Sequence, residues 1–123
     1  MRDGEELVHR YFGAMRRGAA GEAAMRDVLH PAVVYVEPFS GLGTPAIGRE
    51  ATLDRLRAGW AEPLPEMELD VLTVEVVGET ARSTWECRSP ALPGPVRGED
   101  RYRFEGGRIV SLEVVIDLPA AEG

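Results

Sequence analysis

The chain has 123 residues, of which 44% are hydrophobic and 28% are charged, and its formal net charge is -7. This length and composition are typical of one compact globular domain, so we expect a single domain over residues 1–123. The arginines are spread along the chain and form no basic run, which argues against nucleic acid as a partner.

Other absences narrow the range of functions. No stretch has the apolar length of a membrane span, and the first residues are too polar for a secretory signal, so we expect a cytoplasmic protein with no membrane partner. Cys87 is the single cysteine, which excludes an internal disulfide or a thiolate metal cluster within one chain. The sequence has no lysine for Schiff-base chemistry, and its two histidines fit no metal-binding pattern. We expect neither a metal nor a cofactor.

The first half of the chain predicts three helices and one strand. A helix is expected over residues 5–17, because apolar residues recur with helical spacing at Val8, Tyr11, Phe12 and Met15. A shorter helix is expected over residues 22–29, and the apolar run 33–36 predicts a short strand. After a loop over residues 39–48, helical spacing returns over residues 49–60.

The second half of the chain predicts only strands. They are expected over residues 67–77, 81–88, 97–105 and 108–118, with turns between them. The order indicates an α+β fold, in which helices cover one face of a long antiparallel sheet that curls around a cavity. Apolar residues on the other face of the sheet, including Ile109 and Val115, favour a homodimer.

Asp100 lies inside one of the predicted strands, on the side of the pleat that also carries Tyr102 and Phe104. That side is expected to be buried, and burial disfavours the charged form of a carboxyl group that has no partner. Asp100 would then stay protonated and act as a hydrogen-bond donor. The alternative is that Asp100 binds a neighbouring arginine or a backbone amide and only stabilises the sheet.

The remaining proton-handling candidates are other carboxylates and the hydroxyl groups of Tyr11, Tyr35 and Tyr102. Cys87 is a weak nucleophile candidate, because it alternates with Trp85 on a strand in the manner of a structural thiol. Residues 41–46 fit a dinucleotide-binding pattern, but a proline interrupts it and the chain cannot supply a doubly wound sheet. We interpret this segment as a mobile loop over the mouth of the cavity.

Three segments resemble the active-site segments of bacterial ketosteroid isomerases, in the same order and with similar spacing. They are residues 7–12, residues 33–39 with their Glu-Pro pair, and residues 100–104. These isomerases belong to the nuclear-transport-factor-2-like (NTF2-like) superfamily, together with SnoaL-like polyketide cyclases. The resemblance covers nearly the whole chain and implies a cone, formed by a curved antiparallel sheet and three N-terminal helices that enclose a pocket.

The resemblance also implies roles for individual residues. Tyr11 matches the tyrosine of the oxyanion hole, Asp100 matches its protonated aspartic acid, and Glu37 matches the general base. The base of the family is normally an aspartate, so Glu37 is one methylene longer. Leu29 and Leu56 stand where some members carry further tyrosines, which leaves the hydrogen-bond network thinner.

These residues predict a cofactor-independent isomerase that shifts a double bond next to a ketone, through a dienolate, in a hydrophobic, steroid-like substrate. Helical spacing and strand alternation suggest the lining of its substrate pocket: Met15, Phe39, Leu56, Trp60, Trp85 and Leu112. One alternative is a SnoaL-like polyketide cyclase or an epoxide-opening enzyme of secondary metabolism, with Glu37 and Asp100 as an acid/base pair. The other is a dimeric ligand-binding domain without catalysis.

Overall fold

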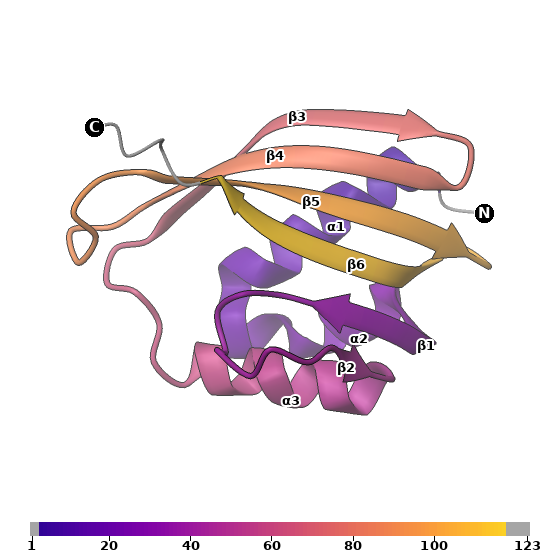
Figure 1. Cartoon of the computed structure of the whole chain (residues 1–123), viewed down its shortest axis with the longest axis horizontal. Coiled ribbons are helices and arrows are strands. Elements are labelled where there is room, and N and C mark those ends of the chain that lie inside the picture. The colour runs from indigo at the N-terminus through magenta and orange to yellow at the C-terminus, as the bar shows by residue number, and fades with distance from the viewer. Residues whose placement is uncertain (1–2, 118–123) are drawn as a thin grey trace.

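The computed structural model describes residues 3–117, which form three α-helices, a short 3₁₀ segment and six strands (Figure 1). In chain order these are α1 (Gly4–Arg17), the 3₁₀ segment η1 (Gly18–Gly21), α2 (Glu22–Val28), β1 (Leu29–Val36), β2 (Ala46–Ile47), α3 (Arg49–Trp60), β3 (Glu68–Val77), β4 (Thr80–Arg88), β5 (Val96–Glu105) and β6 (Arg108–Asp117). Two α-helices precede the first strand, and α3 follows β2. The expectation of three N-terminal helices was therefore wrong, although each predicted helix forms.

Helix α1 begins and ends at residues that satisfy its free backbone groups. Asp3 caps the first turn, where its carboxylate accepts a hydrogen bond of 2.7 Å from the backbone N–H of Glu6. Gly18 ends the helix with φ of +61°, a conformation that costs glycine little, and its N–H binds the carbonyl of Met15. The stop predicted at Gly18 is confirmed.

The six strands form one curved sheet in the order β2-β1-β6-β5-β4-β3. Strands β3 to β6 pair in antiparallel fashion, but β1 runs parallel to β6, with Tyr35 opposite Leu112. The expected antiparallel sheet is therefore a mixed one, and it does not close. Parallel neighbours need a long crossover, which residues 37–107 supply here. The predicted last strand included Leu118, which lies outside the described residues.

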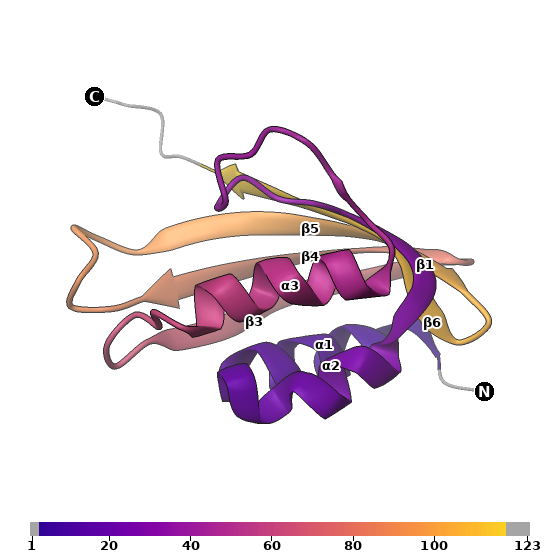
Figure 2. The same cartoon turned by 90° about the horizontal axis from the view of Figure 1, so that it is seen from below.

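The helices lie together on one face of the sheet (Figures 1 and 2). Helix α1 packs against β3 and β4 near one edge of the sheet, whereas α3 packs against β1 and β2 near the other edge. Side chains from the inner face of the sheet and from the three helices together form the core. No helix among residues 3–117 is long and apolar enough to cross a membrane.

A β-bulge in β6 changes which side chains face inward. Arg103 pairs with Ser111 and the next residue, Phe104, pairs with Ile109, so Val110 is the extra residue. This shift reverses the alternation of side chains at the start of the strand. Ile109 is completely buried in the core, and the expectation that it faces outward was wrong. Val115, the other residue expected on a homodimer surface, is partly exposed.

Candidate functional site

Asp100 is buried at the centre of β5, with 2% of its surface exposed. The indole N–H of Trp85 donates a hydrogen bond of 2.9 Å to its Oδ1 atom, and the hydroxyl of Tyr102 lies 3.2 Å from its Oδ2 atom. Burial raises the pKa of Asp100 to about 7, and the two hydrogen bonds keep it from rising further. The group can therefore exchange its proton near neutral pH.

Tyr11 points from the buried side of α1 toward the same region. Its ring packs edge-on against Tyr102, with ring centroids 6.1 Å apart, and its hydroxyl lies near Tyr35. Burial, together with the nearby Tyr35 and Asp100, raises the pKa of Tyr11 well above its usual value. Its hydroxyl thus stays protonated and can donate a hydrogen bond.

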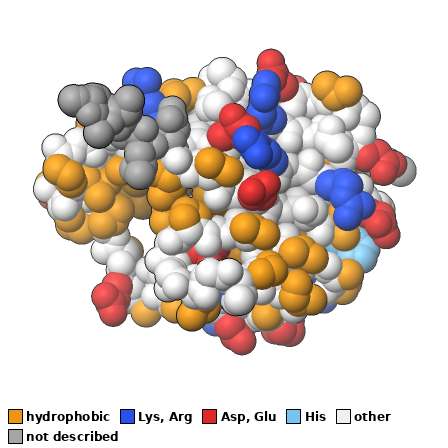
Figure 3. Space-filling model, in the orientation of Figure 1, with side chains coloured by type: hydrophobic (Ala, Val, Ile, Leu, Met, Phe, Trp, Pro, Cys, Tyr) orange, Lys and Arg blue, Asp and Glu red, His pale blue; other side chains and the backbone are white. Residues whose placement is uncertain are grey.

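Asp100 and Tyr11 line an inner cavity of about 400 Å³. Beside these two residues and Tyr35, the described lining is apolar or carries sulfur: Phe12, Met15, Phe39, Leu64, Met67, Leu69, Trp85, Cys87, Leu92, Val96, Val114 and Ile116. Hydrophobic side chains gather around a hollow on the face of the molecule seen in Figure 3. A cavity of this size and composition suits an apolar small molecule.

Glu37 follows the end of β1, and 3% of its side chain is exposed. Its carboxylate accepts hydrogen bonds from the N–H of Ser40 at 2.8 Å, from the hydroxyl of Ser40 at 2.7 Å and from Arg55 of α3 at 3.0 Å. Burial alone would raise the pKa of Glu37, but these donors outweigh it and hold the pKa below its usual value. Glu37 is therefore ionised at neutral pH.

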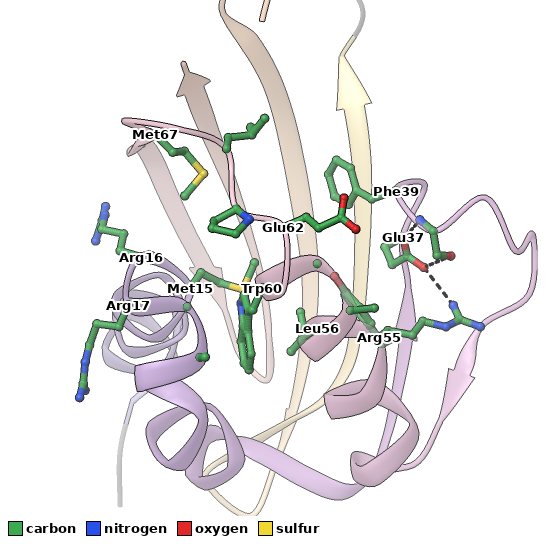
Figure 4. A pocket seen from close by; sticks show the side chains of 18 residues that line it. Met15, Arg16, Arg17, Glu37, Phe39, Arg55, Leu56, Trp60, Glu62 and Met67 are labelled. Carbon is green, nitrogen blue, oxygen red and sulfur yellow. Dashed lines mark hydrogen bonds and ion pairs between the residues drawn. The ribbon is translucent and has the colours of Figure 1, made fainter. Parts of the chain in front are cut away.

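Glu37 lines an outer cavity of about 580 Å³ between α1, α3 and the loop that follows β1 (Figure 4). The outer and inner cavities have five wall residues in common: Met15, Tyr35, Phe39, Leu64 and Met67. Tyr35, one of these shared residues, lies near both Asp100 and Glu37. Arg16 and Arg17 also border the outer cavity, but their side chains point away from it (Figure 4).

The model of the SnoaL-like domain family matches residues 8–112 of the sequence. The chain belongs to the SnoaL-like domain family. Three solved structures illustrate the fold that this SnoaL-like domain shares. An NTF2-like protein of unknown function from Burkholderia pseudomallei is 23% identical, with a TM-score of 0.78 over 95% of this chain and 92% of that chain.

The other two structures come from proteins to which an activity has been provisionally assigned. A candidate polyketide cyclase from Sinorhizobium meliloti is 22% identical, with a TM-score of 0.72 over 89% of this chain and 93% of that chain. A candidate ketosteroid isomerase from Kribbella flavida is 16% identical, with a TM-score of 0.74 over 96% of this chain and 80% of that chain. No protein in the curated set matches the sequence.

The SnoaL-like domain distributes the predicted lining residues over both cavities. Met15 and Phe39 line both, Leu56 and Trp60 line the outer cavity, and Trp85 lines the inner one. Leu112, by contrast, is buried in the core and is absent from the described lining of either cavity. Of the three predicted catalytic residues, Tyr11 and Asp100 border the inner cavity and Glu37 borders the outer one.

Tyr35 is a residue of the site for which the sequence analysis predicted no specific role. It is one of the residues common to the two cavities, and it lies near Tyr11. Burial raises its pKa, and the nearby Glu37 and Asp100 add to this effect. Tyr35 lies near the end of β1, two residues before Glu37. This spacing in an extended segment predicts that both side chains face the same side of the sheet.

Cys87 lines the inner cavity, where burial raises the pKa of its thiol.

No group of three or more His, Cys, Asp and Glu side chains within the described part of the SnoaL-like domain is arranged to hold a metal ion. The polar groups that line the two cavities include hydroxyls, carboxyls, the guanidinium of Arg55, the thiol of Cys87 and the indole N–H groups of Trp60 and Trp85. Hydrogen bonding and proton transfer are therefore the chemistry that these side chains can provide.

The raised pKa of Asp100 makes the stability of the SnoaL-like domain depend on pH. Its pKa is about 7 in the folded protein against an ordinary 3.8, so its contribution to stability is complete below pH 3.8 and is lost as the pH rises to 7. Asp100→Asn should remove this loss. The difference in unfolding free energy between the variant and the wild type should therefore shift in favour of the variant by roughly 2–3 kcal/mol when the pH is raised from about 5 to about 8. Urea unfolding at both pH values measures this change, and a constant difference would contradict the assigned pKa.

Proposed function

We propose that this SnoaL-like domain is a cofactor-independent enzyme that moves a proton next to a ketone and thereby shifts a double bond in an apolar, steroid-like molecule. The observation that carries the proposal is the opposite pKa shift of two carboxyl groups that line neighbouring cavities. The pKa of Asp100 is raised to about 7, and the pKa of Glu37 is held below its usual value. Such a division supplies an acid and a base at the same pH.

In the proposed reaction, the ionised Glu37 takes a proton from the carbon between the ketone and the double bond. The electron pair of that C–H bond moves to form a dienolate, whose negative charge lies on the former ketone oxygen. Tyr11 and the protonated Asp100 donate hydrogen bonds to this oxygen. Glu37 then returns its proton to the far carbon of the dienolate, so the product is a conjugated ketone and the enzyme is unchanged.

The surroundings of the two carboxyl groups support this assignment. The inner cavity is almost entirely apolar, and fixed donors in a water-poor cavity stabilise a developing charge more strongly than water does. Tyr35 lines both cavities and lies near both Asp100 and Glu37, which supports a single ligand that contacts both carboxyl groups. Similarity to a candidate ketosteroid isomerase agrees with this chemistry at the level of the fold.

The same pair of carboxyl groups also favours a second function. Asp100 as the acid and Glu37 as the base could instead open an epoxide or catalyse the ring closure of a polyketide. Membership of the SnoaL-like family and the similarity to a candidate polyketide cyclase support this alternative. The two functions differ in where negative charge develops, and this difference can be measured.

A planar phenol separates the two functions, because it mimics the charged oxygen of a dienolate. An isomerase should bind a naphthol more tightly than the corresponding saturated alcohol, since its donors are directed at an enolate-like oxygen. Both compounds are titrated at constant pH, and turnover is then tested with a β,γ-unsaturated ketone and with a terminal epoxide. Equal affinity for the two compounds, with epoxide turnover and no shift of the double bond, would favour the alternative.

A further inference from the structure

Trp85 lies directly over Gly98 on the neighbouring strand. The two residues are opposite each other in the β4–β5 pairing. A Cβ atom added to Gly98 would lie 2.2 Å from Cζ2 and 2.6 Å from Cε2 of the indole, closer than any real contact. Gly98 is not among the glycines with positive φ in the described chain, so the absence of a side chain provides space for the indole and serves no special backbone conformation.

The space over Gly98 allows the indole to reach Asp100. Gly98 and Asp100 are two residues apart on β5 and therefore face the same side of the sheet. From this position the indole N–H donates its hydrogen bond of 2.9 Å to Oδ1 of Asp100. An indole N–H can only donate, so Oδ1 must act as the acceptor in this pair.

The other oxygen of Asp100, Oδ2, lies beside a hydroxyl group that can both donate and accept a hydrogen bond. The hydroxyl of Tyr102 is 3.2 Å from Oδ2 and 2.7 Å from the hydroxyl of Ser83, and either of these two hydroxyls can donate to the other. All three side chains are buried. Because a hydroxyl both donates and accepts, Tyr102 can accommodate Oδ2 with or without a proton. Trp85 cannot do this for Oδ1.

We propose that Trp85 is a positioning residue that keeps Oδ1 of Asp100 as an acceptor and thereby assigns the acid proton to Oδ2, and that Gly98 provides the space which this arrangement requires. Its catalytic consequence rests on the proposed function, in which the proton on Oδ2 is the one that stabilises the dienolate. The arrangement itself can be observed without a substrate.

Infrared spectroscopy of the free protein tests the proposal at about pH 6, where ordinary carboxyl groups are ionised and Asp100 is mostly protonated. Subtracting the spectrum of Asp100→Asn isolates the carbonyl stretch of protonated Asp100. With the proton on Oδ2, this carbonyl is Oδ1, and Trp85→Phe should raise its frequency because the indole hydrogen bond is lost. Tyr102→Phe should change the frequency much less.

Gly98→Ala should shift the carbonyl band in the same direction as Trp85→Phe, because an added methyl group displaces the indole. Gly94→Ala is the matched control, since an added Cβ there meets no atom within 4 Å. If Tyr102→Phe raises the frequency and Trp85→Phe leaves it unchanged, the proton is on Oδ1 and the proposal is wrong. The result for Trp85→Phe decides this even if Gly98→Ala fails to fold. Expected spectra without isomerase activity would overturn only the proposed function.

Discussion

Replacing Glu37 by glutamine is expected to reduce the rate of proton transfer by about 10²–10⁴-fold, the range in which a positioned general base contributes. The amide keeps the shape of the side chain but cannot accept the substrate proton. Affinity for a naphthol should remain nearly unchanged, because Tyr11 and Asp100, and not Glu37, donate hydrogen bonds to the ligand oxygen. Glu37→Asp, which retains a carboxylate, should have a milder effect. Turnover of a β,γ-unsaturated ketone and titration with the naphthol measure the two quantities.

Arg55 provides the control for this prediction, because Glu37→Gln also weakens the ion pair between the two side chains. Arg55→Met breaks the same pair and leaves the carboxylate of Glu37 in place. If Glu37 is the base, Arg55→Met should retain much more activity than Glu37→Gln. Equal losses in both variants would mean that Glu37 serves to hold the loop through Ser40 and Arg55, and the assignment of the base would then fail.

The second large effect is expected at the oxyanion donors. Asp100→Leu and Tyr11→Phe each remove one donor from the inner cavity, and each should lower the rate by about 10²–10³-fold, or roughly 2.7–4 kcal/mol of transition-state stabilisation. Asp100→Asn should retain part of the activity, because the amide still donates a hydrogen bond. Single-turnover rates with a β,γ-unsaturated ketone measure the chemical step separately from product release.

The controls for the donor variants address folding and binding. Asp100→Leu replaces a buried polar group that binds Trp85, so circular dichroism and urea unfolding should accompany the rates. Tyr11→Phe changes only a hydroxyl and leaves the packing of the ring against Tyr102 in place. Folded variants with wild-type single-turnover rates would exclude these two side chains as oxyanion donors.

Local periodicity was sufficient to predict the three helices and five of the six strands, but β2 (Ala46–Ile47) lies inside the loop expected over residues 39–48. The apolar stripe of α1 and the alternation along β5 each depend on residues that are close in the sequence. The parallel pairing of β1 with β6 joins segments from opposite ends of the chain, and no local pattern specifies such a partner. Similarly, the orientation of Ile109 depends on a bulge opposite Phe104, which strict alternation cannot predict.

The features of the candidate site that depend on neighbouring residues could likewise be predicted, and those that depend on distant segments could not. The burial of Asp100 follows from its position in an alternating strand and was predicted; 2% of its surface is exposed. Its hydrogen bond to Trp85 depends on the pairing of β4 with β5, and the ion pair of Glu37 depends on α3 packing beside β1. Burial by the surrounding fold raises the pKa of Asp100, and hydrogen bonds from Ser40 and Arg55 lower the pKa of Glu37. The sequence could therefore suggest an acid and a base but could not determine their environments.

The central claim is that this SnoaL-like domain removes a proton from the carbon next to a ketone. Hydrogen–deuterium exchange into an apolar cyclic ketone, followed by proton NMR in D₂O, measures this step without knowledge of the natural substrate. We predict that the wild-type protein accelerates exchange at the carbon beside the ketone and that Glu37→Gln removes the acceleration while the ketone still binds. Binding of the ketone without any acceleration of exchange by the wild-type protein would contradict the claim.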